Sequence, residues 1–188
     1  MSPATKMVIV LTVVGAVSGG TLVKVYKRVA PLIEQQRLKR LKEAIFTVLP
    51  EAKDYRVEER NGLVIYRGLD GEGNLVGTAL EVEGPGFQGK IELMLGLDSQ
   101  MEKLLGIEVL ESVETPGLGG KITTQEFKEQ FKGLAVTPKI TYIRNRNPAT
   151  PKKPGEIDAI TGATISSAAV VDMLNKEIAM VSEALKVK

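Results

Sequence analysis

Hydroxyl side chains gather in one short stretch near the C-terminal end of the chain. Thr161, Gly162, Ala163 and Thr164 follow one another, and Ser166 comes two positions later. Threonine and serine hydroxyls can be esterified, and glycine permits a sharp turn that other residues resist. These residue types at this spacing indicate a turn that presents a hydroxyl group that could be esterified.

The flanking patterns predict that this turn joins a strand to a helix. Residues 156–160 alternate polar and apolar side chains, as in a short strand, whereas residues 165–186 lack Gly and Pro and repeat apolar residues at helical spacing. Thr164 therefore stands where a helix cap belongs. A helix N-terminus suits a phosphate, since its N–H groups are unpaired and its partial charge is positive. Ordinary capping is the alternative.

A second stretch, Glu114-Thr115-Pro116-Gly117-Leu118-Gly119, follows a predicted strand. Pro-Gly favours a tight turn and leaves backbone N–H groups exposed at little steric cost. A plain connecting loop is the alternative interpretation.

Composition excludes several other kinds of site. The 188 residues include no Cys and no His, which rules out disulfides, zinc fingers, cysteine-ligated iron–sulfur clusters, histidine-ligated haem and Ser-His-Asp triads. The net charge of +2 and the absence of Trp give no sign of a nucleic-acid partner. We predict no metal ligands and no catalytic residues, so a redox role would need an organic cofactor.

Together the two stretches resemble the FMN-binding domain of membrane redox complexes. Asp-x-Ile-Thr-Gly-Ala-Thr-x-Ser, residues 158–166, is similar to the family's flavinylation motif, and Glu-Thr-Pro-Gly-Leu-Gly is similar to its second hallmark. The resemblance implies covalent FMN, joined to Thr164 through a phosphoester. It also implies the remaining cofactor-binding residues: Glu114, Thr115, Gly117, Leu118, Gly119, Thr161, Gly162, Ala163 and Ser166. Gly120 departs from the acidic residue expected before Lys121, which leaves any role of this lysine open.

The resemblance covers nearly the whole chain and is greatest to the G subunits of Rnf-type complexes, which are siblings of the C subunits of the sodium-pumping NADH:quinone reductase. It implies an electron relay within an ion-translocating ferredoxin:NAD oxidoreductase, rather than an enzyme complete by itself. The implied partners are the other membrane and redox subunits and a flavin transferase for maturation. A regulatory FMN-binding sensor domain and a non-redox structural membrane adaptor are the alternatives.

The N-terminal region, residues 1–28, is predicted to be a membrane anchor. The uncharged run from Met7 to Val23 would rise roughly 25 Å as a helix, against a hydrocarbon core of about 30 Å. A cleaved signal peptide and a buried helix are alternatives. Basic residues after the run favour a cytoplasmic domain, whereas the resemblance implies a flavin domain on the extracytoplasmic side of the cytoplasmic (inner) membrane.

Residues 29–188 are predicted to form a single FMN-binding domain of the α+β class. We expect a helix over 29–48, an antiparallel β-meander over 63–66, 75–82, 91–97 and 105–113, a helix over 123–131, a strand over 137–144, a loop over 145–155 and the C-terminal helix. Residues 84–89 match G-x-G-x-x-G, but a strand follows, so we interpret them as a strand connection.

Overall fold

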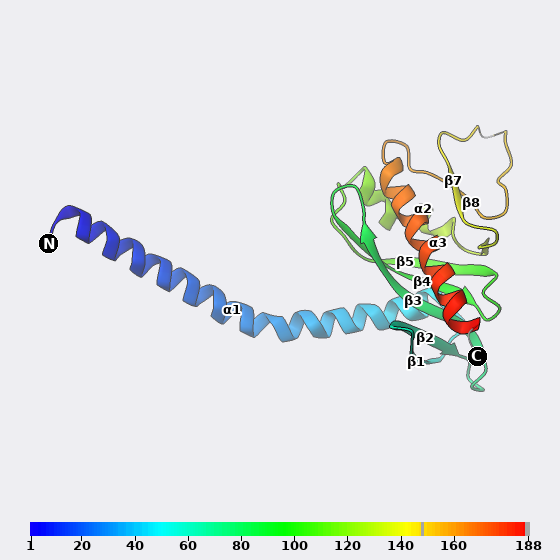
Figure 1. Cartoon of the computed structure of the whole chain (residues 1–188), viewed down its shortest axis with the longest axis horizontal. Helices are drawn as coiled ribbons and strands as arrows, with labels where there is room; N and C mark the ends of the chain where they lie inside the picture. The colour runs from blue at the N-terminus through cyan, green and yellow to red at the C-terminus, as the bar shows by residue number, and fades with distance from the viewer. Residues whose placement is uncertain (148, 187–188) are drawn as a thin grey trace. The chain divides into compact units, whose positions relative to one another are not determined.

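The computed structural model describes residues 1–147 and 149–186 of the chain. They divide into two compact units, residues 1–40 and residues 41–188. From Pro3 onward the first unit is helical and belongs to helix α1 (Pro3–Val48), whose last residues belong to the second unit (Figure 1). The apolar run is long enough to cross a membrane, and none of it is buried.

Helix α1 is continuous where the sequence predicts an anchor followed by a separate helix over 29–48. Pro31 lies inside it. A proline removes one backbone hydrogen bond and bends a helix, but good helix formers on either side keep the chain helical. Leu32, Ile33 and Leu38 of this helix are all exposed. The helix begins to bury side chains only from Ala44.

A six-stranded antiparallel sheet, with its strands in sequence order, forms the centre of the second unit. The strands are β1 (Asp54–Arg60), β2 (Leu63–Leu69), β3 (Leu75–Pro85), β4 (Lys90–Asp98), β5 (Lys103–Ser112) and β6 (Leu134–Ala135). The predicted meander and the α+β class are confirmed. Strands β1 and β6 escaped prediction because β1 is an edge strand of mostly charged, exposed residues and β6 is only two residues long.

The two faces of the sheet carry separate apolar layers, since neighbouring strand residues point to opposite faces. Ile65, Leu80 and Leu95 face the core that includes Val170, Leu174 and Ile178 of the C-terminal helix. The alternate residues Tyr66, Ala79 and Met94 pack with the last turns of α1. Gly96 allows this approach, because a Cβ there would stand 2.3 Å from the carbonyl oxygen of Val48.

Short elements follow β5, two of them before β6 and two after it, and lead to one long helix. They are η1 (Gly119–Thr123), α2 (Gln125–Glu129), β7 (Thr141–Ile143), β8 (Glu156–Asp158) and α3 (Thr164–Lys186), with β7 and β8 paired in parallel. The predicted C-terminal helix is confirmed. The helix expected over 123–131 is shorter, and Thr124 caps it; the strand expected over 137–144 is reduced to β7. Figure 1 shows α3 lying across β3, β4 and β5.

Candidate functional site

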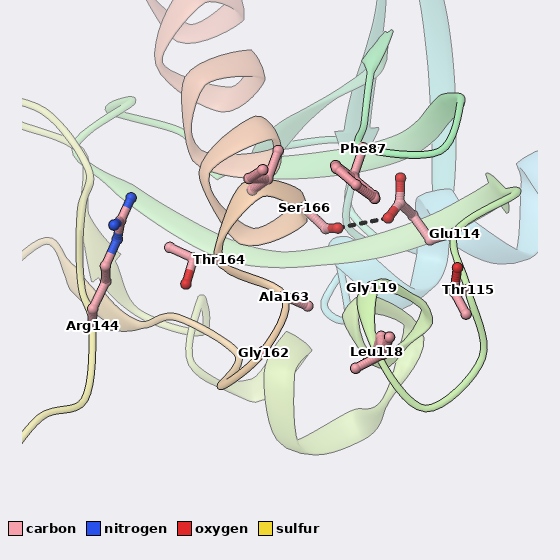
Figure 2. Close-up of a pocket in the computed structure, with 11 residues that line it drawn as sticks. Phe87, Glu114, Thr115, Leu118, Gly119, Arg144, Gly162, Ala163, Thr164 and Ser166 are labelled. Carbon is pink, nitrogen blue, oxygen red and sulfur yellow. Dashed lines mark hydrogen bonds between the residues drawn. The ribbon is translucent and has the colours of Figure 1, made fainter.

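A cavity of about 480 Å³ opens where three segments of the second unit meet. The segments are the β3–β4 connection, the loop after β5, and the turn that leads into α3; Arg144, directly after β7 (Thr141–Ile143), adds a fourth part of the wall. The cavity is lined by Phe87, Glu114, Thr115, Leu118, Gly119, Arg144, Gly162, Ala163, Thr164, Ile165 and Ser166 (Figure 2). The structure therefore brings together the two sequence stretches that stand about fifty residues apart.

The turn before α3 holds Thr164 at the edge of this cavity. The N–H of Ala163 donates to the carbonyl of Ile160 at 3.0 Å, and Gly162, the third residue of the turn, has φ +82°. Such a turn requires glycine at that position. Thr164 is the first residue of the helix, and Ala163 takes the capping position that we predicted for Thr164. The threonine hydroxyl nevertheless stands at the helix N-terminus.

The buried Ser167 side chain fastens this turn. Its Oγ accepts a hydrogen bond from the N–H of Ile160 at 3.0 Å and donates one to the carbonyl of Ala163 at 3.2 Å. Sequence analysis missed this residue, because a serine in the first turn of a helix is common and carries no signal of its own. Ser167 limits how far the turn before Thr164 can move.

The Pro-Gly stretch forms a turn of the same kind. The N–H of Leu118 donates to the carbonyl of Thr115 at 3.1 Å, with Pro116 second in the turn and Gly117 third at φ +78°. The predicted tight turn is confirmed. The N–H groups of Leu118 and Gly120 both bond to the carbonyl of Thr115, so these two are not among the exposed donors that we expected.

Apolar side chains form an exposed rim around the cavity. Phe87 is 65% exposed, Leu118 is 50% exposed and Ile165 is 58% exposed, although each is large and apolar. Each comes from a different one of the three segments. Such a cluster at the mouth of a cavity marks a surface suited to covering a flat apolar group. We call Phe87, Leu118 and Ile165 the apolar rim.

Arg144 supplies positive charge at the other end of the cavity. Figure 2 shows it beside Thr164, away from Glu114 and Leu118. Within residues 1–147 and 149–186, Arg144 makes no hydrogen bond or ion pair, and the first turn of α3 contains no acidic residue. Lys121, whose role the sequence analysis left open, lines a different hollow together with Thr161. Arg144 is therefore the cation that the cavity presents to Thr164.

Glu114 is buried at the wall of the cavity, only 6% exposed. Its Oε2 accepts a hydrogen bond from Ser166 Oγ at 2.6 Å, and its Oε1 accepts one from the N–H of Gln88 at 2.9 Å. Burial opposes ionisation most strongly, but donation by Ser166 and by the backbone of residues 87–89 holds the pKa of Glu114 below its ordinary value. The carboxylate is therefore charged at neutral pH.

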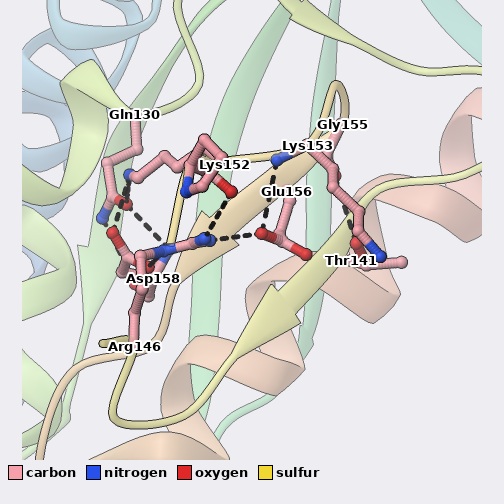
Figure 3. Close-up of polar contacts among 9 residues, drawn as sticks. Gln130, Thr141, Arg146, Lys152, Lys153, Gly155, Glu156 and Asp158 are labelled. Atoms are coloured by element: carbon pink, nitrogen blue, oxygen red, sulfur yellow. Dashed lines mark hydrogen bonds and ion pairs between the residues drawn. The ribbon is translucent and has the colours of Figure 1, made fainter. Parts of the chain in front are cut away.

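A set of paired polar side chains surrounds β8, the strand that precedes the turn (Figure 3). We call this set, Gln130, Arg146, Lys152, Glu156 and Asp158, the polar cluster. Arg146 bonds to both Asp158 and Glu156, and Lys152 Nζ lies 2.8 Å from Asp158 Oδ2. Gln130 bonds to the N–H and carbonyl of Asp158 at 2.8 and 3.2 Å. The cluster fixes the strand that enters the turn.

Eight of the ten predicted site residues line the cavity, and two do not. Thr161 faces the neighbouring hollow, and Gly117 shapes the turn without reaching the cavity wall. Phe87, Arg144 and Ile165 line the cavity and were missed. Single exposed residues in loops show no periodicity, so nothing in the pattern marked Phe87 or Arg144. In the described part of the chain, no group of acidic residues is arranged to hold a metal.

Comparison with known proteins shows the family to which the chain belongs. The family model for the FMN-binding domain matches residues 86–179, which include every residue that lines the cavity. The chain belongs to the FMN-binding domain family. The G subunit of the ion-translocating oxidoreductase complex of Methanosarcina acetivorans is 36% identical to it over 186 residues, which cover 95% of this chain and 94% of that protein.

Further relatives agree with this assignment. The G subunit of the Na⁺-translocating ferredoxin:NAD⁺ oxidoreductase complex of Acetobacterium woodii is 28% identical, covering 92% of this chain and 89% of that protein. Shewanella oneidensis NqrC has a similar fold, with TM-score 0.57 and 19% identity over 62% of this chain and 55% of that one. The C subunit of the Na⁺-translocating NADH-quinone reductase of Parabacteroides distasonis gives TM-score 0.51 and 22% identity over 71% and 63%. The FMN-binding domain fold is thus shared with both.

The cavity of this FMN-binding domain has the chemistry that FMN requires. Its volume falls within the range of about 300–1,000 Å³ that is usual for cofactor sites. The apolar rim can cover a flat ring system. The α3 N-terminus and Arg144 can balance a phosphate, because both present positive charge near Thr164.

Proposed function

We propose that this chain is the membrane-anchored flavoprotein subunit that carries electrons, through FMN esterified to Thr164, within an ion-translocating ferredoxin:NAD oxidoreductase complex. One observation supports this most strongly. The hydroxyl of Thr164 stands at a helix N-terminus, beside Arg144, in the cavity of a chain related to the G subunits of such complexes along nearly its whole length.

Each part of the cavity has a role in this function. The N-terminus of α3 and Arg144 would bind the phosphoester and balance its charge. The apolar rim would orient the ring and keep water from part of it. When bound, FMN accepts electrons singly or in pairs, which lets it pass them between one-electron and two-electron carriers. The chain's own residues hold the group and need not react during electron transfer.

Attachment of FMN would require a separate flavin transferase. A threonine hydroxyl is a weak nucleophile unless a base activates it. Asp158, the nearest acidic residue before Thr164 in the sequence, does not line the cavity, and Arg146 and Lys152 engage its carboxylate. Glu114 lines the cavity, but its hydrogen bonds go to Ser166 and Gln88. These contacts favour an external enzyme over self-attachment.

Peptide mass spectrometry tests the attachment site. The full chain is co-expressed with a flavin transferase, digested and searched for the mass of FMN on the peptide that contains residues 161–166. We expect the modification on Thr164 and a fluorescent band on a denaturing gel under ultraviolet light. Modification of Thr161 or Ser166, or a colourless protein as a structural adaptor would give, contradicts the proposal.

We further propose that α1 spans the cytoplasmic membrane once and leaves the flavin domain on the extracytoplasmic side. The absence of cysteine from the sequence makes a clean labelling test possible. Cysteine replaces Ser2 in one variant and the exposed Glu59 in another, and intact cells are treated with a membrane-impermeant maleimide. We expect labelling at position 59 and not at position 2; the reverse pattern reverses the orientation.

A further inference from the structure

Glu114 joins three of the segments that wall the cavity. It belongs to the loop after β5, which carries Leu118. Its Oε1 reaches the β3–β4 connection through the N–H of Gln88 at 2.9 Å, and its Oε2 reaches the first turn of α3 through Ser166 Oγ at 2.6 Å (Figure 2). Ser166 lies fifty-two positions away in the sequence. One carboxylate therefore joins three segments that are distant along the chain.

Two glycines leave the space that this carboxylate occupies. A Cβ on Gly119 would lie 2.1 Å from Glu114 Oε2 and 2.5 Å from Ser166 Oγ. A Cβ on Gly86 would lie 2.4 Å from Glu114 Oε1. Real Cβ atoms do not approach oxygen so closely, so any larger residue at either position would displace the carboxylate. The loop, the strand connection and the helix turn fit around this one group.

The charge on Glu114 is balanced by hydrogen-bond donors. Within residues 1–147 and 149–186, no lysine or arginine forms an ion pair with it. Its partners are the Ser166 hydroxyl in α3 and backbone N–H groups of residues 87–89. Hydrogen bonds to a charged acceptor are about twice as strong as those between neutral groups. A buried carboxylate with several such donors holds them firmly, because an unpaired charge there would be costly.

We propose that Glu114 is a positioning residue, whose buried carboxylate fastens the β3–β4 connection, the loop after β5 and the first turn of α3 into one wall and so fixes the apolar rim. Each of the three segments carries one residue of the apolar rim. The β3–β4 connection carries Phe87, the loop carries Leu118 and the helix turn carries Ile165. Because the three segments are fixed relative to one another, these three side chains are fixed as well. That their positions orient a flavin ring rests on the proposed function.

Hydrogen–deuterium exchange tests the clamp directly in the full chain. In Glu114→Ala, we expect exchange to rise roughly tenfold or more in residues 86–90 and 163–168 as well as in the loop after β5, because local opening loses its strongest restraint. Ser166→Ala should loosen residues 163–168 and leave 86–90 protected, since the Gln88 bond remains. Glu111→Ala, which removes an exposed charge from neighbouring β5, is the matched control and should match wild type.

A spectroscopic measurement tests whether the flavin ring is held in a fixed orientation. In protein loaded with FMN, the circular dichroism of the flavin bands in the visible region depends on a fixed asymmetric surrounding. We expect Glu114→Ala to retain FMN on Thr164 but lose most of this signal, toward that of free FMN. Glu114→Gln keeps an acceptor and a similar shape, so it should recover much of the signal. Where the alanine variant does not fold, Glu114→Asp, one methylene too short to reach both partners, replaces it.

Two results would overturn the clamp. One is unchanged exchange at residues 86–90 in Glu114→Ala, and the other is wild-type flavin dichroism in that variant. These failures are distinct from failure of the proposed function, in which wild-type Thr164 carries no FMN. The exchange measurements apply equally to chain expressed without a flavin transferase, so they test the clamp even then.

Discussion

The polar cluster surrounds β8, and the cavity is lined by the turn that follows this strand, yet the two regions use arginine differently. In the polar cluster, each charged side chain is paired: Arg146 with two carboxylates and Lys152 with Asp158. At the cavity, Arg144 has no partner in the described part of the chain, and the apolar rim is exposed. Folded proteins pair buried polar groups and cover large apolar ones. The cavity departs from the second tendency, because its large apolar side chains are exposed, as in a binding site.

Two arginines separated by one residue, Arg144 and Arg146, show this difference between the two regions. Arg146 is held by Asp158 and then Glu156, which raises its pKa further above its ordinary value. Arg144 follows β7 directly and faces the cavity. The same residue type therefore stabilises the fold at one position and is available to a ligand at the other.

The largest effect is expected at Thr164. Thr164→Val replaces a hydroxyl by a methyl group of similar size, so the packing of α3 should hardly change. We expect complete loss of covalent flavin, measured by gel fluorescence and intact mass, with an unchanged far-ultraviolet circular dichroism spectrum. Thr161→Val, in the neighbouring hollow, is the matched control and should remain flavinylated.

The two arginines should separate stability from attachment. Arg146→Gln leaves two carboxylates without their shared partner, so the midpoint of thermal unfolding should fall by several degrees. Arg144→Gln should leave that midpoint unchanged and slow flavin attachment several-fold, because the incoming phosphate loses a positive charge. Unfolding is followed by circular dichroism and attachment by timed mass spectrometry. A loss of stability in Arg144→Gln, with normal attachment, would reverse the assignment.

Sequence reasoning succeeded where the chain repeats a pattern. The hairpin around residues 70–74 was predictable because Asp70 and Gly73 favour a turn between two apolar strands, and Asp70 does cap that turn. Helix α3 was predictable because residues 165–186 keep an unbroken helical period. These signals are local, and they fix most of the sheet and the last helix.

The meeting of the two motifs was not predictable from local signals. Glu114 and Ser166 are brought into contact by packing of α3 on the sheet, and only the family resemblance indicated that their stretches share a site. Phe87 and Arg144 were missed because their role depends on which neighbours the fold supplies. The continuity of α1 was missed because an uncharged run followed by a basic segment suggests two elements, whereas the backbone is helical through both.

A smaller effect is expected from the apolar rim. Leu118→Ala removes apolar surface without touching Thr164 or Arg144, so FMN attachment should be preserved. The ring would become more exposed to water, and its midpoint potential should shift by tens of millivolts, on the scale of about 59 mV per tenfold change for one electron. A redox titration of the loaded protein measures the shift. An unchanged potential would mean that Leu118 does not face the ring.

The smallest effect concerns the response of the polar cluster to acid. Burial opposes ionisation of Asp158, but Lys152 and Arg146 hold its pKa below the ordinary 3.8; Arg146 does the same for Glu156, whose ordinary value is 4.5. A carboxyl whose pKa is lower in the folded state stabilises the fold above its ordinary pKa. That stabilisation is lost as the pH falls through the lowered value. Stability should therefore stay level from pH 7 to near these ordinary values and decline below them.

Asp158→Asn tests this response, because the amide cannot titrate. Relative to wild type, its unfolding midpoint should be lower at pH 7, and the gap should narrow as the pH falls below 3.8. Glu111→Gln, an exposed carboxyl without an ion pair among the described residues, should run parallel to wild type throughout. Because Asp158 is partly exposed, salt should reduce the gap at pH 7 as well. A gap that stays constant with pH would mean that Asp158 supports the turn through Gln130 and its backbone bonds, rather than through its charge.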